Sequence, residues 1–263
     1  MVDYLLEQPG ETEHTINPFV GETNDSIVND MWAKPVQANH VREALTSASS
    51  GPVKEGSVGA GTGTQTYHWK GGIGTSSRVL PEPLGGYTVG VLVQSNLLAG
   101  ATLSMNGAPI GRELGKYAYK KELEQNQRNH EKVRGGSIMI IVATDAPLSA
   151  LQLSRVARRV PMGLAALGGG FENTSGDIFL AFSTGNDNDS VNNFGINTVR
   201  ELNDVLLDPI YRATADATEE AIFNAMIAAE TMVGINGNTL FALPHDQLIE
   251  VLRRYGRIKE EKK

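Results

Sequence analysis

Short apolar runs along the chain predict three strands in the core of the protein. Residues 138–143, I-M-I-I-V-A, are all apolar and rich in β-branched side chains, with glycines before the run and Pro147 after it. Such a run is typical of a strand buried on both faces. Residues 86–96, G-Y-T-V-G-V-L-V-Q-S-N, carry valines at alternate positions, and residues 178–184, I-F-L-A-F-S-T, form another apolar run. We expect all three segments to be largely buried strands.

Helical spacing of apolar residues predicts helices in four further regions. The first covers residues 39–48 and is capped by the side chain of its first residue. An amphipathic helix follows Pro147 and is kinked at Pro161. Residues 216–233 and 244–256 are the other two helices. The helix after Pro147 is predicted to face the core with Leu148, Leu151, Val156, Val160 and Leu164.

Glycine-punctuated segments complete the pattern. Residues 53–96 alternate apolar stretches with glycines and predict several short strands. Residues 101–110 predict a hairpin with Asn106 and Gly107 at its tip. Strands and helices alternate in blocks along the chain, and there is no internal repeat. This order predicts a layered α/β fold.

Composition and charge narrow the classes of function. The 263 residues correspond to one large or two small domains with a substantial core. The formal net charge of −7 argues against nucleic acid as a partner, because phosphate binding needs a basic surface. The chain has no cysteine, which excludes disulfides, thiolate metal sites and a cysteine nucleophile. No apolar run approaches the ~20 residues that span a bilayer, so we expect no membrane partner.

The histidines indicate neither a metal site nor a serine hydrolase of the usual kind. All five are scattered, without the H-x-x-H or H-E-x-x-H spacing of metal ligands. There is no G-x-S-x-G elbow. The glycine-rich residues 59–64 lack the lysine of a P-loop and are better explained by closely packed backbone. We therefore expect no metal and no cofactor, and a catalytic serine would use an N-terminal amine, a lysine or a carboxylate as its base.

Ser137 is the residue whose position most suggests chemistry. It lies between the polar, glycine-marked residues 116–136 and the strand that begins at Ile138. If the chain were cut between Gly136 and Ser137, one residue would carry both a hydroxyl and a free α-amine. Such an amine, with a pKa of about 7.7–8.0, can accept a proton near neutral pH. The alternative is an ordinary glycine turn followed by a serine that opens a strand.

Four other residues have side chains that could assist such a serine. Asn96 ends a predicted strand, where its amide could donate to a developing oxyanion. Ser175 and Asp177 are two residues apart, so an extended segment places both side chains on one side, where they can relay a proton. Glu22 lies in a turn-rich cluster. Taken alone, each of the four is better explained by a turn or a solvated surface.

Together, seven motifs in a fixed order make the chain resemble a known family. They are V-G-E-T-N-D (from Val20), E-G-S-V-G-A-G-T-G (from Glu55), K-G-G-I-G-T-S-S-R (from Lys70), G-V-L-V-Q-S-N (from Gly90), G-G-S-I-M-I-I-V-A-T-D-A-P-L (from Gly135), S-G-D-I-F-L-A-F-S-T (from Ser175) and A-T-E-E-A-I-F-N-A (from Ala217). The set is similar to the DmpA-type aminopeptidases, which include L-aminopeptidase/D-amidase-esterases and β-peptidyl aminopeptidases. The similarity extends from about residue 18 to the C-terminus.

The resemblance implies a fold and a set of roles. The expected fold is an αββα sandwich formed by one domain, residues 1–263. Self-cleavage between Gly136 and Ser137 would divide it into an α part, residues 1–136, and a β part, residues 137–263. The roles that the resemblance implies are Ser137 as nucleophile, Ser175 and Asp177 as the assisting hydroxyl and acid, Asn96 as the oxyanion-hole amide, and Glu22 and Asn24 as substrate-binding residues.

The chain departs from the family pattern at three points. Many relatives carry Glu where this chain has Asp177, and some carry a useful Tyr where it has Asn24. Members of the family also carry a long segment before the region of Glu22 that has no counterpart here. We therefore expect the sandwich without the family's N-terminal segment, and a protein that could require another chain to supply it.

From these observations we expect a self-processing serine aminopeptidase or amidase that acts on small peptides, with Glu22 holding the substrate ammonium group. The resemblance further implies a homo-oligomer of αβ units and no organic cofactor. Two alternatives stay open: a relative that hydrolyses non-natural amides such as nylon oligomers, and an uncleaved family member that acts as a binding or assembly subunit. We expect a cytoplasmic location, with the periplasm as the alternative.

Overall fold

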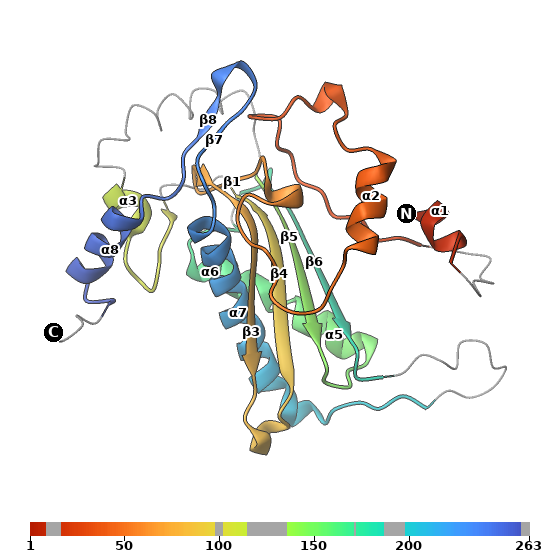
Figure 1. The fold of residues 1–263 in the computed structure, drawn as a ribbon. Coiled ribbons are helices and arrows are strands. Elements are labelled where there is room, and N and C mark those ends of the chain that lie inside the picture. Colours follow the sequence, from red (N-terminus) through yellow and green to blue (C-terminus); the bar gives the residue numbers. More distant parts are fainter. Residues whose placement is uncertain (9–16, 98–101, 115–135, 171, 187–197, 259–263) are drawn as a thin grey trace.

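A four-stranded sheet forms the centre of the computed structural model, which describes residues 1–8, 17–97, 102–114, 136–170, 172–186 and 198–258. The strand order is β3-β4-β5-β6 (Figure 1). β3 pairs antiparallel with β4, β4 antiparallel with β5, and β5 parallel with β6. The strands are β3 (Gly72–Val79), β4 (Thr88–Asn96), β5 (Ser137–Thr144) and β6 (Gly176–Ser183).

Three helices cover one face of this sheet. The long helix α7 (Leu207–Ile227) packs against β3 and β4, and α5 (Ala150–Ala157) packs against β6. The third helix, α6 (Val160–Ala166), lies against α7. The layers are pressed closely together: a Cβ atom on Gly74 would lie 1.9 Å from the backbone oxygen of Ala221 in α7. The valine side chains of β4 and the apolar residues of α7 meet in one buried cluster, which is the core of the protein.

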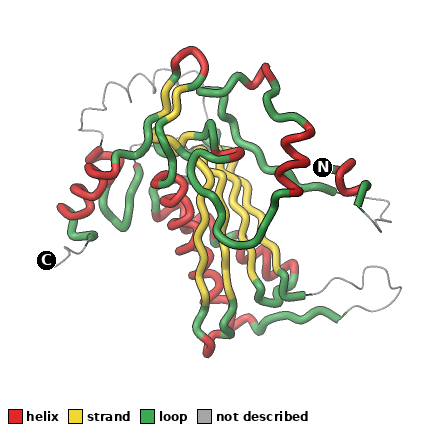
Figure 2. Tube along the Cα trace, viewed as in Figure 1, coloured by secondary structure: helices red, strands yellow, loops and turns green. Residues whose placement is uncertain are grey.

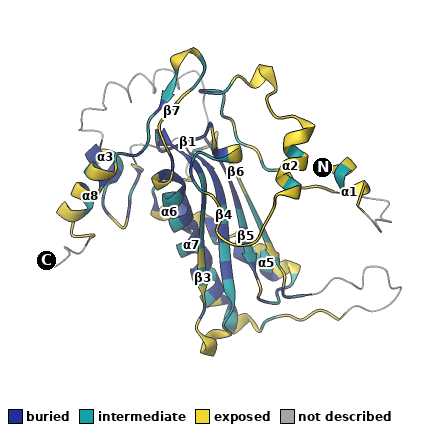
Figure 3. Cartoon of the chain, in the orientation of Figure 1, coloured by how far each residue is buried: buried dark blue, intermediate teal, exposed yellow. Residues whose placement is uncertain are grey.

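Shorter elements surround one end of the sheet, as Figure 2 shows. Two ribbons of two strands each pair antiparallel, and helix α3 packs against α8. Helix α2 has no buried residue and is mostly exposed (Figure 3). These elements are α1 (Val2–Leu6), α2 (Ala38–Thr46), β1 (Gln65–Thr66), β2 (Trp69–Lys70), α3 (Ile110–Leu114), β7 (Met232–Val233), β8 (Thr239–Leu240) and α8 (His245–Arg254). Short 3₁₀ turns occupy Met31–Ala33, Gly59–Gly61, Glu82–Leu84, Asp204–Leu206 and Ile235–Gly237.

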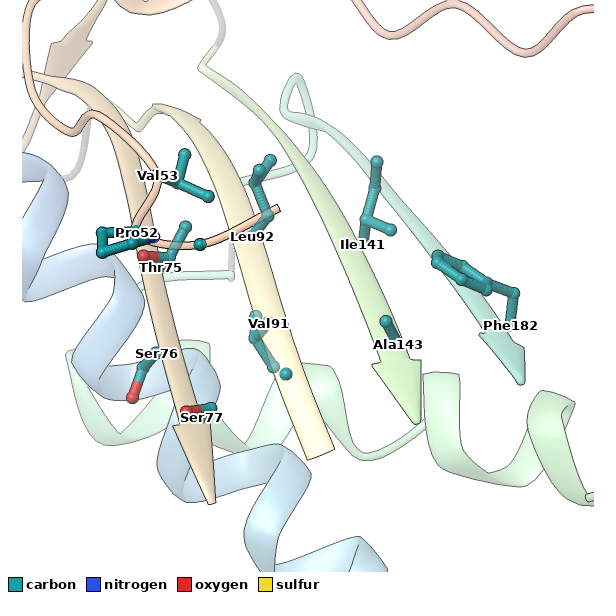
Figure 4. A pocket seen from close by; sticks show the side chains of 12 residues that line it. Pro52, Val53, Thr75, Ser76, Ser77, Val91, Leu92, Ile141, Ala143 and Phe182 are labelled. Atoms are coloured by element: carbon teal, nitrogen blue, oxygen red, sulfur yellow. The ribbon is translucent and has the colours of Figure 1, made fainter. Parts of the chain in front are cut away.

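The face of the sheet opposite the helices is largely open in the part of the chain that the structure describes. The loop at Pro52 and Val53 crosses it and leaves a cavity of about 500 Å³ between itself and the strands (Figure 4). Apolar side chains line this face, with Leu92 and Ile141 partly buried and Phe182 44% exposed. The middle of the sheet therefore presents apolar surface that, within the described residues, no second layer covers.

The layered α/β class predicted from the sequence is confirmed, and so are the three strands. Their burial differs from the prediction. β5 alternates between fully and partly buried side chains at its far end, and Ile178 of β6 is 51% exposed, because β6 is an edge strand and the second face is open. The division at residue 136 stays a prediction: β3 and β4 precede it, β5 and β6 follow it, and all four strands belong to one sheet.

Several predicted elements are shifted or absent. The first of the four predicted helices is Ala38–Thr46 and is capped by Gln37, with His40 completing the capping box. Pro161 does interrupt the helical region, because it lies in the first turn of a second helix, α6. Leu151 is 62% exposed and Gln152 is buried in its place, since the helix starts at Ala150 and its face is rotated accordingly.

The longest helix also differs from its prediction. It begins at Leu207, nine residues before the predicted start at residue 216, because the proline at position 209 is compatible with a first helical turn. It ends at Ile227, where the chain leaves the helix for β7. Residues 53–64 form no strand, only a 3₁₀ turn and one bridge between Gly56 and Ile73.

Asn106 and Gly107 do form the predicted tight turn, both at positive φ, with a single bridge between Met105 and Ala108. Residue 101 of that predicted hairpin lies outside the described residues. The final helix, predicted at residues 244–256, is α8, His245–Arg254. Among the described helices, none is long and apolar enough to cross a membrane.

Candidate active site

Ser137 is the first residue of β5, at the end of the sheet near β1. Its neighbours in register are Asn96 on β4 and Gly176 on β6. The Ser137 hydroxyl donates a hydrogen bond of 2.7 Å to the carbonyl oxygen of Gly136, the residue before it. The same oxygen accepts the backbone N–H of Gly176 at 3.1 Å. The peptide bond before Ser137 thus has a hydroxyl and a polarising N–H on its carbonyl.

Gly176 is also what leaves space for the serine. A Cβ atom at this position would lie 3.3 Å from the Ser137 hydroxyl oxygen, which is tighter than an ordinary van der Waals contact. The glycine therefore brings the backbone of β6 close to Ser137 without crowding it. Sequence reasoning identified Ser175 and Asp177 but assigned no role to the glycine between them, because neither spacing nor composition indicates which carbonyl its N–H reaches.

Asn96 and Ser137 lie on the same face of the sheet, because directly opposite residues of an antiparallel pair share a face. The Asn96 side chain is 4% exposed. Its carbonyl oxygen accepts the N–H of Gln65 at 2.9 Å, and its amide nitrogen donates to the backbone oxygen of Asn24 at 2.9 Å. A primary amide carries two N–H donors, so, as far as the described residues show, one remains for a ligand beside Ser137. Both fixed bonds orient that donor.

The segment that contains Glu22 and Asn24 crosses this same face. Thr23 accepts a hydrogen bond of 2.8 Å from the side chain of Gln94, and Gly21 lies against Met139 of β5. The side chains of Glu22 and Asn24 are exposed. The Asn24 side chain accepts the N–H of Ser26 within its own turn, so Asn24 contacts the site through its backbone oxygen.

Ser175 and Asp177 form the hydrogen-bonded pair that their spacing predicts: the serine hydroxyl donates to a carboxylate oxygen at 2.6 Å. Asp177 is in register with Ile138, which is fully buried in the helix-side core. Because paired residues of neighbouring strands share a face, the Asp177 side chain lies on the helix side of the sheet. Ser137 lies on the other face. The strand register therefore places the Ser175–Asp177 pair on the face opposite the Ser137 hydroxyl.

Burial perturbs ionisable groups near this end of the sheet, Lys70 and Tyr67 among them. Lys70 is fully buried, donates to the backbone oxygens of Gly61 and Gly71 at 2.9 and 2.6 Å, and burial lowers its pKa to about 8. Burial likewise raises the pKa of the Tyr67 phenol, with a further contribution from the carboxylates of Glu172 and Asp177. Among the described residues, no group of three or more His, Asp or Glu side chains could hold a metal ion.

Sequence comparison matches this chain to a known protein family. The profile of peptidase family S58 matches residues 1–240, which include all six positions described above as candidate catalytic or binding residues. The chain belongs to peptidase family S58. This confirms the resemblance to the DmpA-type aminopeptidases that the sequence motifs indicated.

Several named proteins share much of this sequence and fold. The β-peptidyl aminopeptidase BapA of Sphingosinicella microcystinivorans is 42% identical over 249 residues, which cover 93% of this chain and 63% of that protein. The crystal structure of the PH0078 protein from Pyrococcus horikoshii OT3 is 40% identical, with a TM-score of 0.84 over 98% of this chain and 69% of that one.

For a second similar solved structure the fold itself is named. The L-aminopeptidase D-Ala-esterase/amidase of Ochrobactrum anthropi is described as a prototype for the serine aminopeptidases and a variant of the Ntn hydrolase fold. It is 40% identical, with a TM-score of 0.79 over 89% of this chain and 62% of that one. The chain thus spans a little over three fifths of the length of BapA and of this enzyme.

Proposed function

We propose that this protein is a self-processing serine aminopeptidase or amidase whose nucleophile is Ser137. The observation that carries the proposal is the hydrogen bond of 2.7 Å from the Ser137 hydroxyl to the carbonyl oxygen of Gly136. It places the hydroxyl oxygen beside the carbonyl carbon of the bond to be cut. Membership of family S58 and the names of the similar proteins support the same activity.

Self-processing begins with attack of the Ser137 oxygen on the carbonyl carbon of Gly136. The negative charge that develops on the carbonyl oxygen is stabilised by the N–H of Gly176, which already donates to it at 3.1 Å. The carbon–nitrogen bond then breaks, and the nitrogen of Ser137 takes the proton that the hydroxyl loses. Water hydrolyses the resulting ester, which frees the carboxylate of Gly136 and restores the hydroxyl of Ser137.

The freed α-amine of Ser137 then serves as the base of the mature enzyme. It takes the proton of the hydroxyl as the oxygen attacks the carbonyl of a substrate amide or ester. The free N–H of Asn96, on the same face, donates to the oxyanion. The protonated amine releases its proton to the leaving group, and water attacks the acyl-enzyme to complete hydrolysis. Ser175 and Asp177, on the opposite face, stabilise the protonated amine.

In this proposal, Glu22 is the residue that makes the enzyme prefer substrates with a free N-terminal amino group. Its carboxylate is exposed on the segment that crosses the face of Ser137 and Asn96. A charge-assisted hydrogen bond from the free amino group of the substrate would hold that group one residue away from the scissile bond. The enzyme would then release single residues from small peptides, and it needs no metal or organic cofactor.

The test is a denaturing intact-mass spectrum of the purified protein beside its Ser137→Ala variant. We expect two fragments from the wild type, one ending at Gly136 and one beginning at Ser137, and one uncut chain from the variant. Ser154→Ala is the matched control, since Ser154 is exposed on α5, and it should cleave normally. Hydrolysis of aminoacyl p-nitroanilides by Ser137→Ala would refute the proposal.

Substrate chemistry is tested with a panel of α-aminoacyl, β-aminoacyl and aminohexanoyl amides. The β-aminoacyl members are included because the relative from Sphingosinicella is named a β-peptidyl aminopeptidase. Preference for aminohexanoyl amides would instead favour an enzyme for synthetic polyamides. Glu22→Gln should raise KM for substrates with a free amino group and leave N-acetylated esters unaffected, since only the former carry an ammonium.

The open face of the sheet favours a second candidate, a family member that acts only when another polypeptide covers that face. Ile178 and Phe182 are 51% and 44% exposed there. Burial of such apolar residues stabilises a protein by about 25 cal/mol per Å², so this face gains from a covering layer. An uncut wild-type chain that is processed after a partner polypeptide is added would support this candidate.

Native mass measurement of the processed protein tests the expected homo-oligomer of αβ units.

A further inference from the structure

Tyr67 lies in an unusual turn beside the candidate active site. β1 and β2 are joined by two residues only, Tyr67 and His68, since Thr66 pairs directly with Trp69. Both turn residues have positive φ values, 51° and 67°. Two-residue turns of this kind favour Asn and Gly, because larger residues are strained there. Such a strained backbone conformation persists only where surrounding contacts hold it, and strained residues are frequent at functional sites.

The backbone of this turn is tied to the end of β4. The N–H of Tyr67 donates to the oxygen of Leu97 at 2.7 Å, and the N–H of Gln65 donates to the Asn96 side chain. The ribbon that carries Tyr67 thus also orients the candidate oxyanion-hole amide. The position of Tyr67 is coupled to the site through one short strand.

The phenol of Tyr67 is buried without a hydrogen-bond partner. Its side chain is 1% exposed, and in the described part of the chain its hydroxyl contacts no donor or acceptor. It lies against Gly169, where a Cβ atom would be only 2.5 Å from the phenol oxygen. A buried hydroxyl has lost its hydrogen bonds to water and needs an acceptor within the protein. Native proteins rarely leave a buried hydroxyl without a hydrogen-bond partner.

The Ser175–Asp177 pair carries a candidate acceptor on the same side of the sheet. Tyr67 belongs to the buried cluster that contains Ile138, and Ile138 is in register with Asp177. One oxygen of Asp177 accepts the Ser175 hydroxyl, and the other accepts no hydrogen bond within the described structure. Besides burial, the carboxylates of Glu172 and Asp177 raise the pKa of Tyr67, so both lie within electrostatic reach of the phenol.

We propose that Tyr67 is a positioning residue of the active site: in the processed enzyme its phenol donates a hydrogen bond to the second carboxylate oxygen of Asp177. The resulting chain, from Tyr67 through Asp177 to Ser175, holds the carboxylate in one orientation, directed at the α-amine of Ser137. This role rests on the proposed function. It adds to that function a residue that touches neither the substrate nor the nucleophile.

The first test replaces Tyr67 by Phe and measures stability and turnover separately. Stability to urea, measured on the Ser137→Ala background, should not fall, because the hydroxyl has no partner among the described residues of the uncut chain. kcat should fall by roughly 10- to 100-fold with KM within a factor of two, since a misplaced catalytic group slows the chemical step. Tyr87→Phe, which changes a partly buried tyrosine elsewhere on the same core, should change none of these values.

A second variant moves the phenol and keeps its hydroxyl. Gly169→Ala places a methyl group 2.5 Å from the phenol oxygen, and the next two nearest atoms belong to the same tyrosine ring. We expect a loss of kcat similar to that of Tyr67→Phe. Combined with Tyr67→Phe, the alanine should add no further loss, because the oxygen that it displaces is gone. Additive losses would show that Gly169 and Tyr67 act independently and would overturn the role.

The remaining outcomes separate this role from the proposed function. A processed, active enzyme in which Tyr67→Phe keeps its kcat, or changes only KM, overturns the role of Tyr67 alone. So does a structure of the processed enzyme with the phenol oxygen more than about 3.5 Å from both carboxylate oxygens of Asp177. If Glu172→Gln, and not Asp177→Asn, abolishes the effect of Tyr67→Phe, the acceptor is Glu172 and the proposed chain is wrong. A wild-type chain that is neither cleaved nor active overturns the proposed function and this role with it.

Discussion

Lys70 gives a prediction about how the stability of the fold changes with pH, and both the direction and the size of this change follow from the structure. Its ammonium group is fully buried and donates to two backbone oxygens, and among the described residues no carboxylate forms an ion pair with it. Burial disfavours the charged form, so the pKa falls from 10.5 to about 8. The unfolded chain keeps the ordinary value.

The direction of the pH effect follows from where the proton is held. Below pH 8 both the folded and the unfolded chain carry the charge, and Lys70 adds no pH dependence. Between pH 8 and 10.5 the folded chain has released the proton and the unfolded chain retains it, so the folded state gains stability as pH rises. A shift of about 2.5 units, at about 1.36 kcal/mol per unit, corresponds to a gain of about 3 kcal/mol.

The variant that isolates this effect is Lys70→Met, which has a side chain of similar length that cannot titrate. It leaves the oxygens of Gly61 and Gly71 without a donor, which adds a difference in stability that does not change with pH. Unfolding in urea is followed by the fluorescence of the buried Trp69, in a Ser137→Ala background so that the chain stays intact. The quantity of interest is the free energy of unfolding of the chain that retains Lys70 minus that of the Lys70→Met variant at each pH.

We expect this difference to be constant below about pH 7.5 and to rise by about 3 kcal/mol by pH 10.5. Lys54→Met, at an exposed position, is the control and should show no such rise. A difference that stays flat to pH 10.5 would mean that Lys70 titrates normally, and the argument from burial would be wrong. A difference that falls with pH would show that the charged form is the one stabilised by folding.

Two further predictions concern packing and catalysis. Gly74→Ala should destabilise the fold by at least about 1–3 kcal/mol in urea unfolding, because its Cβ would lie 1.9 Å from the backbone of α7. Gly90→Ala, whose Cβ would meet only one atom at 3.9 Å, should be tolerated, and equal losses would contradict the tight contact. Asn96→Asp keeps an acceptor for the N–H of Gln65 and removes the amide donor. It should lower kcat by roughly 10²- to 10³-fold with little change in KM, and steady-state kinetics with an unchanged kcat would exclude Asn96 from the oxyanion hole.

Much of the fold could be predicted because strands and helices differ in the period of their apolar residues. The β-branched run at residues 138–143 lies inside β5, and the valines of residues 86–96 lie inside β4. The failures occur where local pattern and packing disagree. Leu151 has helical spacing but faces solvent, and residues 53–64 are rich in glycine because backbones approach closely there, as at Gly61 against Gly72 and Ile73, and not because they pair as strands.

The candidate site was likewise only partly predictable from the sequence. Sequence spacing was sufficient to pair Ser175 with Asp177, because residues two apart in an extended segment share a side. It was not sufficient to show that Ser137 faces away from that pair, or that the N–H of Gly176 reaches the carbonyl of Gly136. Those relations depend on strand register, which joins residues about 40 positions apart and leaves no local mark in the sequence.

By itself, the sequence determined the class of fold, the main strands and most helices, the absence of cysteine chemistry, and the family to which the chain belongs. Local periodicity and ordered motifs are enough for each of these. The tertiary structure alone decided which face of the sheet the helices cover, which face carries Ser137 and Asn96, and where Lys70 and Tyr67 are buried. Burial and electrostatics depend on which distant segments meet, and only the folded chain brings them together.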